Sequence, residues 1–130
     1  DHQGLINEAF RLLKSKGVFI LSGPFNWHIH EEPYDFFRFS KYGFKYILEK
    51  AGFEVIEIMS NGGAWATLGQ TINHTLGFTN PKANKVARGI KYIFRKLKCH
   101  ILVNKFFAYL DAKDSNGINT LNYVIVAKKN

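Results

Sequence analysis

Residues 5–22, LINEAFRLLKSKGVFILS, join a helix pattern to a strand pattern and decide the fold class. Apolar residues recur at three- and four-residue steps over residues 5–16, which predicts an amphipathic helix that ends at a left-handed Gly17. The unbroken apolar run of residues 18–21 follows at once, as is typical of a strand buried on both faces of a parallel sheet. A helix that leads directly into a buried strand predicts an α/β fold.

The helix–strand unit repeats after a connecting segment. Residues 25–40 mix polar and aromatic side chains without a clean period, which predicts a structured loop. Ser40 is expected to cap a helix over residues 42–51 that ends at Gly52. Residues 53–59 then alternate between apolar and polar side chains, which predicts a strand with one wetter face.

The remaining segments are expected to be mainly helical. Residues 64–76 have a helical composition, and Pro81 suits the first turn of a long helix from residue 82 to about residue 110. One face of that long helix is apolar and the opposite face is basic. Residues 121–128 are rich in β-branched side chains, which predicts a final strand.

Length and composition limit the class of protein. The 130 residues, 46% of them hydrophobic, fit a single globular domain over residues 1–130, in which residues 77–113 form a helical basic insert. This apolar content excludes a disordered chain, and the absence of about 18 consecutive apolar residues excludes a spanning helix. The single Cys99 excludes an internal disulfide, so we expect a cytoplasmic protein. Because the chain starts without Met, on what resembles the beginning of a helix, we expect it to be part of a longer protein.

The net positive charge is concentrated in the predicted insert. Eight basic residues lie between Glu57 and Asp111 and equal the whole net charge of +8; they are Lys82, Lys85, Arg88, Lys91, Arg95, Lys96, Lys98 and Lys105. A basic amphipathic helix can contact an anionic membrane surface, and we single out Lys85, Arg88, Lys91 and Arg95 for such a contact. The alternatives are a lid over an active site and an ordinary solvated helix face. Nucleic acid is disfavoured because the aromatic residues lie on the apolar side.

The predicted loop after the first strand carries the densest set of chemically useful side chains. In open α/β sheets, ligands bind beyond the carboxyl ends of the strands, where this loop would lie. We therefore expect substrate contacts from Trp27, His28, His30, Glu31, Tyr34 and Arg38. If the substrate must lose a proton, the candidate bases are His28 and His30. The structural alternative is that Arg38 pairs with Glu31, Glu32 or Asp35 and fixes the loop.

A metal site at the same loop is a less favoured alternative. The pair His28-x-His30 could chelate a metal if the segment were extended, with a carboxylate of Glu31 or Glu32 and a third imidazole from His74 or His100. The segment has no strand pattern, so we expect no metal.

Three short motifs of the chain resemble those of one enzyme family. Residues 8–17, EAFRLLKSKG, are similar to a helix E-x-x-R-x-L-K-P-G-G before a fifth strand, with Ser15 in place of Pro and Lys16 in place of the first Gly. Residues 48–55, LEKAGFEV, resemble L-x-x-A-G-F-x-V before a sixth strand, and residues 30–40, HEEPYDFFRFS, resemble a motif of one subgroup. Together the motifs resemble the C-terminal half of the class I S-adenosylmethionine-dependent methyltransferases, specifically the bacterial general methyltransferase domain.

The resemblance implies a fold, and it also implies which part of the protein binds the cofactor and which part binds the methyl acceptor. It implies a partial Rossmann-like sheet of strands five, six and seven, in which the seventh, residues 121–128, lies antiparallel between the other two. It places the residues that hold S-adenosylmethionine in a preceding part of the protein, and it leaves this span the wall that binds a small or lipid-linked methyl acceptor. The first strand would then have an unprotected edge, so we expect association with the missing half or a homo-oligomer. The alternative function is a non-catalytic module that docks on an anionic membrane or a partner through the basic helix.

Overall fold

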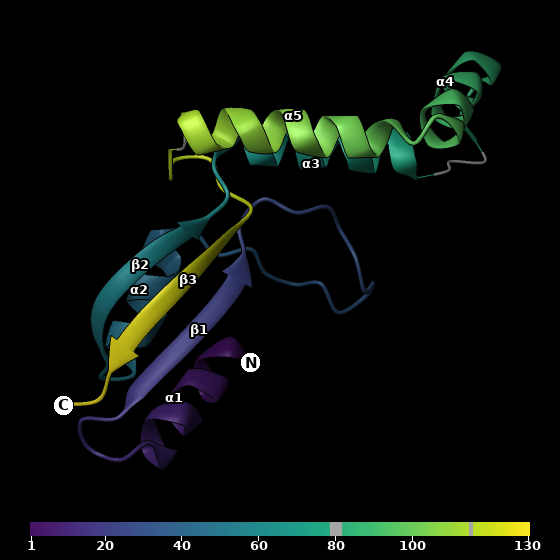
Figure 1. Cartoon of the computed structure of the whole chain (residues 1–130). Helices are drawn as coiled ribbons and strands as arrows, with labels where there is room; N and C mark the ends of the chain where they lie inside the picture. Colours follow the sequence, from purple (N-terminus) through teal and green to yellow (C-terminus); the bar gives the residue numbers. More distant parts are fainter. Residues whose placement is uncertain (79–81, 115) are drawn as a thin grey trace. The chain divides into compact units, whose positions relative to one another are not determined.

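The computed structural model describes residues 1–78, 82–114 and 116–130, and it has the α/β composition predicted from the sequence (Figure 1). The chain divides into two compact units. The sheet unit, Asp1–Asn61 with Leu121–Asn130, contains α1 (His2–Leu12), β1 (Val18–Pro24), α2 (Lys41–Lys50), β2 (Glu54–Asn61) and β3 (Asn122–Lys128). The helical unit, Gly62–Thr120, contains α3 (Ala64–Gly77), α4 (Lys85–Lys96) and α5 (Cys99–Lys113).

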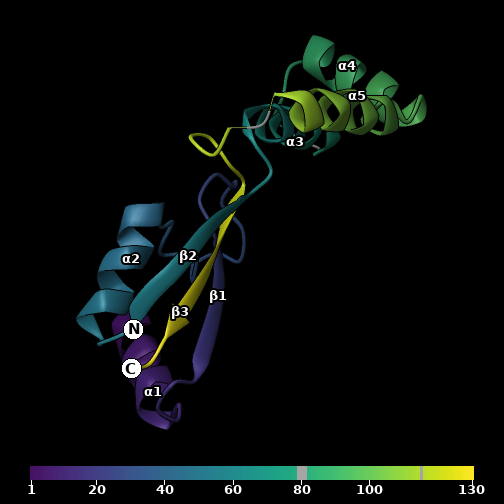
Figure 2. The same ribbon diagram turned by 60° about the vertical axis from the view of Figure 1, so that its left-hand side comes forward.

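The three strands form one sheet in the order β1-β3-β2 (Figures 1 and 2). The central strand β3 is antiparallel to both neighbours, with Val126 opposite Ile20 of β1 and Ile125 opposite Ile58 of β2. β2 has a bulge between Val55 and Glu57. The expected order, with the last strand between the other two and opposite to them in direction, is confirmed.

The core of the sheet unit lies between the sheet and the helices α1 and α2. Its largest fully buried apolar side chains are Ile6 of α1, Leu48 of α2 and Ile125 of β3. Burial of each side chain of this size stabilises the fold by about 1.5–3 kcal/mol. The predicted cap is confirmed at α2, where the Ser40 hydroxyl accepts a hydrogen bond from the Gly43 backbone N–H at 3.2 Å.

The prediction that the first strand is buried on both faces was wrong. Val18 and Ile20 are 56% and 66% exposed, whereas Phe19 and Leu21 pack against the core. The physical reason is that α1 and α2 contribute to the same core, on the same face of the sheet. The other face of β1 therefore has no cover among the described residues.

The predicted left-handed Gly17 was also wrong. α1 ends earlier, with Leu13 as an extended C-cap, and the positive φ of 63° falls on Lys16. The turn is fixed by the end of the chain, because the Lys16 N–H donates to the Lys129 carbonyl at 2.7 Å and the Lys129 N–H donates to the Gly17 carbonyl at 3.0 Å. Gly52, where the second helix is expected to end, has a positive φ of 101°.

The helical unit is built on the antiparallel pair of α3 and α5. A Cβ added to Gly69 of α3 would lie only 2.7 Å from the Cβ of Phe107, so the two helices approach closely there. Farther along the pair, the Asn73 side chain donates to Asn104 Oδ1 at 2.6 Å. This unit is larger than the predicted insert of residues 77–113, because α3 packs against α5.

The predicted long helix from residue 82 to about residue 110 is divided in two. Lys98 has a φ of 51° and separates α4 from α5, because a left-handed residue interrupts the helical hydrogen-bond series. α4 begins after Asn84, whose side chain accepts from the Ala87 N–H at 2.8 Å. The predicted helix start at Pro81 lies outside the described residues. None of the described helices is both long enough and apolar enough to cross a bilayer.

Candidate functional site

The loop between β1 and α2 is held together by Arg38 and Asp35. Both terminal nitrogens of the guanidinium donate to the carboxylate, Nη1 to Oδ1 and Nη2 to Oδ2, the latter at 2.6 Å. Nη2 also donates to the His28 carbonyl at 3.1 Å, and Nη1 donates to the Phe37 carbonyl at 3.0 Å. The Asp35 side chain is only 8% exposed, so this two-point charged pair is largely removed from water. One guanidinium thus ties together three points of the loop.

The charges of this pair stabilise each other. Hydrogen bonds from Arg38 hold the pKa of the Asp35 carboxyl well below its usual range, and the His30 backbone N–H, which donates to Oδ2 at 2.9 Å, lowers this pKa further. The same hydrogen bonds raise the pKa of Arg38. The sequence offered Glu31, Glu32 and Asp35 as partners of Arg38, and in the structure Arg38 pairs with Asp35. Arg38 Nε is buried without a hydrogen-bond partner among the described residues.

The two candidate bases, His28 and His30, are neighbours in the loop, with ring centroids 5.9 Å apart. Nδ1 of His30 lies 3.2 Å from the His28 carbonyl oxygen, 3.3 Å from Asp35 Oδ2 and 3.3 Å from Arg38 Nη2. Two of these three neighbours are acceptors, which favours the tautomer with the proton on Nδ1. That tautomer leaves a lone pair on Nε2, which is the arrangement required of a general base.

The other predicted substrate-binding residues divide into two groups. The Trp27 ring lies 5.4 Å from the His28 ring, so it belongs with the histidines and Arg38. Glu31 and Tyr34 are exposed, Tyr34 to 76%, and their contact is a backbone hydrogen bond of 2.9 Å. The structure therefore brings four of the six predicted residues together.

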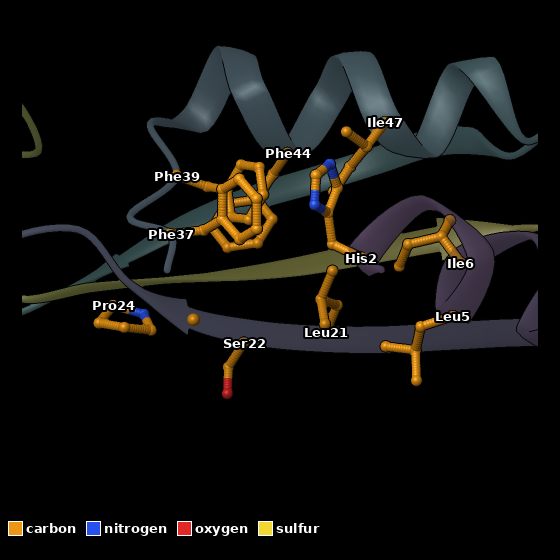
Figure 3. Close-up of a pocket in the computed structure, with 11 residues that line it drawn as sticks. His2, Leu5, Ile6, Leu21, Ser22, Pro24, Phe37, Phe39, Phe44 and Ile47 are labelled. Atoms are coloured by element: carbon orange, nitrogen blue, oxygen red, sulfur yellow. The ribbon is translucent and has the colours of Figure 1, made fainter. Parts of the chain in front are cut away.

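A cavity of about 220 Å³ lies where this loop meets α1, β1 and α2 (Figure 3). Its lining residues are His2, Leu5, Ile6, Leu21, Ser22, Gly23, Pro24, Phe37, Phe39, Phe44 and Ile47. The Phe37 and Phe39 rings are stacked with centroids 5.6 Å apart, and Figure 3 shows both beside the His2 ring. Whole small-molecule sites occupy about 300–1,000 Å³, so this cavity suits one ring or a short alkyl chain.

His2 is a site residue that the sequence analysis missed. Its imidazole meets the rings of Phe37 and Phe39 edge to face, at centroid distances of 4.5 and 5.1 Å. Its Nδ1 is buried and has no hydrogen-bond partner among the described residues. In Figure 3 the Ser22 hydroxyl points away from these rings, so the imidazole is the polar group that faces them. The spacing Phe37-x-Phe39 indicates a pair of aromatic side chains in the sequence. No residue near them in the sequence indicates that they contact the first turn of α1.

The arrangement does not fit S-adenosylmethionine or a metal ion. The cavity is small and mostly apolar, whereas this cofactor has an adenosine and a charged amino acid group. In the part of the chain that the structure describes, no three His, Cys, Asp or Glu side chains are grouped to share a metal ion. The loop instead offers an oriented imidazole at His30, and the cavity offers an apolar hollow that the His2 ring borders.

The four basic residues singled out for anion contact all lie on α4. Lys91 Nζ donates to the Phe78 carbonyl at 3.0 Å, so this lysine also helps to hold α4 in the helical unit. Lys85, Arg88 and Arg95 are exposed. Within the described ranges none of the four forms an ion pair.

Comparison with known proteins gives no match: no family model, no curated protein and no solved structure is significantly similar to this chain.

Proposed function

We propose that this chain is the acceptor-binding half of an S-adenosylmethionine-dependent methyltransferase that acts on a small or lipid-linked acceptor. The observation that carries the proposal is the sheet order β1-β3-β2, with β3 antiparallel to both neighbours. The sequence resemblance implies this arrangement for the fifth, seventh and sixth strands of such an enzyme. In this sheet an antiparallel strand lies between two strands that share one direction, and only some α/β folds have that arrangement.

The placement of the helices supports the proposal. α1 leads into β1 and α2 leads into β2, and both helices bury residues in one core on one face of the sheet. Two of the three motifs that carry the resemblance, residues 8–17 and 48–55, lie at these two helix–strand junctions, and the third, residues 30–40, lies in the loop after β1. The motifs and the topology therefore point to the same parts of the chain.

The uncovered side of the sheet gives independent support. Val18, Ile20 and Met59 are 56%, 66% and 38% exposed on the face opposite the helices, and within the described residues β1 pairs with β3 alone. Exposed apolar surface beside an unpaired strand edge favours contact with further protein. In the proposal, the cofactor-binding strands continue the sheet from the edge of β1, and their helices cover this face.

The loop cluster supplies the acceptor side of the reaction. The cavity beside Phe37 and Phe39 would take an apolar ring or chain of the acceptor, with the His2 imidazole available for one hydrogen bond. Asp35 orients His30, whose Nε2 would accept the proton that the acceptor loses. S-adenosylmethionine would supply the methyl group from the other half of the protein. Since methyl transfer to a good nucleophile depends mainly on alignment, the cavity would contribute chiefly by positioning.

The proposal is tested with the complete product of the gene that encodes this chain. The enzyme is incubated with methyl-labelled S-adenosylmethionine and a pooled extract of lipids and small metabolites, and labelled products are separated. We expect label transfer, with kcat lowered about 10²–10⁴-fold in His30→Gln. His100→Gln on α5 should leave the rate unchanged. Absence of transfer, or equal rates in both variants, would contradict the assignment.

A further inference from the structure

We propose that α4 docks the protein on the surface of an anionic lipid bilayer, with the helix axis parallel to that surface. The inference goes beyond the methyl-transfer proposal and does not depend on it. It rests on an exposed apolar stripe along α4 and on the basic side chains around the same helix.

The apolar stripe consists of Val86, Ile90, Ile93 and Leu97, at successive steps of four, three and four residues. Side chains at these spacings lie along one side of a helix. All four are exposed, to 71%, 52%, 55% and 66% respectively. Contact between water and a continuous apolar surface of this kind is unfavourable, and such surfaces mark interaction sites.

The helical unit does not use this stripe for its own packing. Its main contact is the close approach of α3 and α5 at Gly69 and Phe107. From α4, the buried side chain is Phe94, and the neighbouring Lys91 reaches the Phe78 carbonyl after α3. Phe94 and Lys91 lie on adjacent turns of one side of α4, and therefore this side faces the rest of the helical unit. The stripe lies next to this side on the helix surface. Figures 1 and 2 both show α4 against the end of the α3–α5 pair where α5 begins.

The basic side chains of α4 have no acidic residue near them in the sequence. No Asp or Glu occurs between Glu57 and Asp111. Among the residues that the structure describes, Lys85, Arg88 and Arg95 form no ion pair. These cations are therefore available to phosphate or carboxylate groups outside the chain.

An anionic bilayer would contact both the apolar stripe and the basic side chains of α4. A helix that lies in the interface buries its apolar side about 5–10 Å into the boundary between headgroups and acyl chains, and its cations reach anionic headgroups. A second copy of the chain would cover the stripe but would bring another +8 of charge close by. Nucleic acid would supply phosphates, but its binding sites stack bases on aromatic rings, and the stripe is aliphatic. The combination of charge and aliphatic surface therefore favours lipid.

The first test is sedimentation of the full chain with vesicles of phosphatidylcholine and phosphatidylserine in equal amounts. We expect binding that weakens on pure phosphatidylcholine and when salt rises from about 0.1 M to about 1 M, where the Debye length falls from about 10 Å to about 3 Å. Each cation removed should lower the partition coefficient roughly fivefold, so Lys85→Gln/Lys96→Gln, two exposed lysines that flank the stripe, should lower it roughly 25-fold. The matched control, Lys14→Gln/Lys41→Gln, removes the same charge from the sheet unit and should have little effect.

The second test addresses the stripe itself. We expect Ile90→Ser/Ile93→Ser to abolish vesicle binding, while circular dichroism reports whether α4 still folds. The matched control is Leu12→Ser/Ile118→Ser, because these side chains are also exposed, to 66% and 85%, but lie outside α4. This control should bind vesicles like the unmodified chain.

The third test measures orientation and still works if the stripe variants misfold. Spin labels are placed on Ile90→Cys or Arg88→Cys, each in a Cys99→Ser background that removes the single native thiol. On vesicles, the label at residue 90 should be exposed to oxygen and shielded from a polar nickel complex. The label at residue 88 should show the opposite ratio.

Three outcomes would overturn the proposal. In the first, Ile90→Ser/Ile93→Ser and its control Leu12→Ser/Ile118→Ser reduce vesicle binding equally. In the second, the spin labels at residues 88 and 90 lie at equal depth in the bilayer. The third is a different occupant: a dimer that Ile90→Ser/Ile93→Ser dissociates without any vesicle binding, or single-stranded RNA that binds with no dependence on the stripe.

Discussion

The carboxylate of Asp111, near the end of α5, accepts hydrogen bonds from the backbone N–H of Gly63, the N-cap of α3. The distances are 3.1 Å to Oδ1 and 2.9 Å to Oδ2, and Oδ1 also accepts from the Ala66 N–H at 3.1 Å. Gly63 has no side chain with which to cap the helix. A residue distant in sequence thus provides the cap for α3, and its negative charge lies at the positive end of the helix dipole.

This cap predicts a specific loss of stability. Asp111→Ala should lower the free energy of unfolding of the helical unit by about 1–2 kcal/mol, because it leaves the N–H groups of Gly63 and Ala66 unpaired. Asp111→Asn keeps one acceptor oxygen and should cost less. Urea unfolding followed by circular dichroism measures both differences. Equal stability of Asp111→Ala and the unmodified chain would contradict the capping role.

Two helical glycines should respond to Ala in opposite directions. A Cβ at Gly69 would meet Phe107 at 2.7 Å, so Gly69→Ala should lower the stability of the α3–α5 pair by about 1–3 kcal/mol through overpacking. A Cβ at Gly89 meets nothing within 4 Å, so Gly89→Ala in α4 should raise helix stability by about 1 kcal/mol. Thermal unfolding of the two variants compares them directly. Stabilisation by Gly69→Ala would show that the close helix approach is absent.

The pair of Asp35 and Arg38 predicts a pH-dependent contribution to loop order. Because the folded-state pKa of Asp35 is lowered, its contribution is fully present above the unfolded-state pKa of about 4. It is lost as pH falls from there through the lower folded-state pKa. The protection of the His30 amide against hydrogen exchange should therefore be greater in the unmodified chain than in Asp35→Asn at pH 7. This difference should shrink below about pH 4, and a constant difference over that range would contradict the linkage.

The exposed face and edge of β1 predict association of this chain in isolation. Light scattering should give a mass above that of the monomer, and Ile20→Lys should shift the chain toward monomer by placing a charge on the exposed side of the edge strand. Ile118→Lys adds the same charge at an exposed site of the helical unit and should leave the mass unchanged. If the chain is monomeric and the β1 amides exchange hydrogen rapidly with solvent, the edge of β1 is stable in water and the predicted association is wrong.

Local patterns predicted the sheet unit well. The Ser40 cap, the turn at Gly52 and the alternation in residues 53–59 each depend on neighbouring residues, and the structure has all three elements. The burial of β1 could not be predicted in the same way. An unbroken apolar run such as residues 18–21 does not tell which faces other elements cover, and here both helices lie on one face.

The candidate site was predictable in composition but not in arrangement. The sequence identified the loop and offered Asp35 as one partner of Arg38, because charges a few residues apart in a loop commonly pair. It could not identify His2, whose contact with Phe37 joins segments 35 residues apart. It also predicted one continuous helix through Lys98, since no Gly or Pro there marks the left-handed break.

Binding of S-adenosylmethionine tests the central proposal most directly. Isothermal titration calorimetry would compare the complete product of the gene with this 130-residue chain alone. We predict that the complete product binds the cofactor, through a strand followed by a Gly-rich loop encoded upstream of Asp1, and that the chain alone does not. A complete product that fails to bind S-adenosylmethionine, or a reading frame that starts at Asp1, would contradict the methyltransferase assignment.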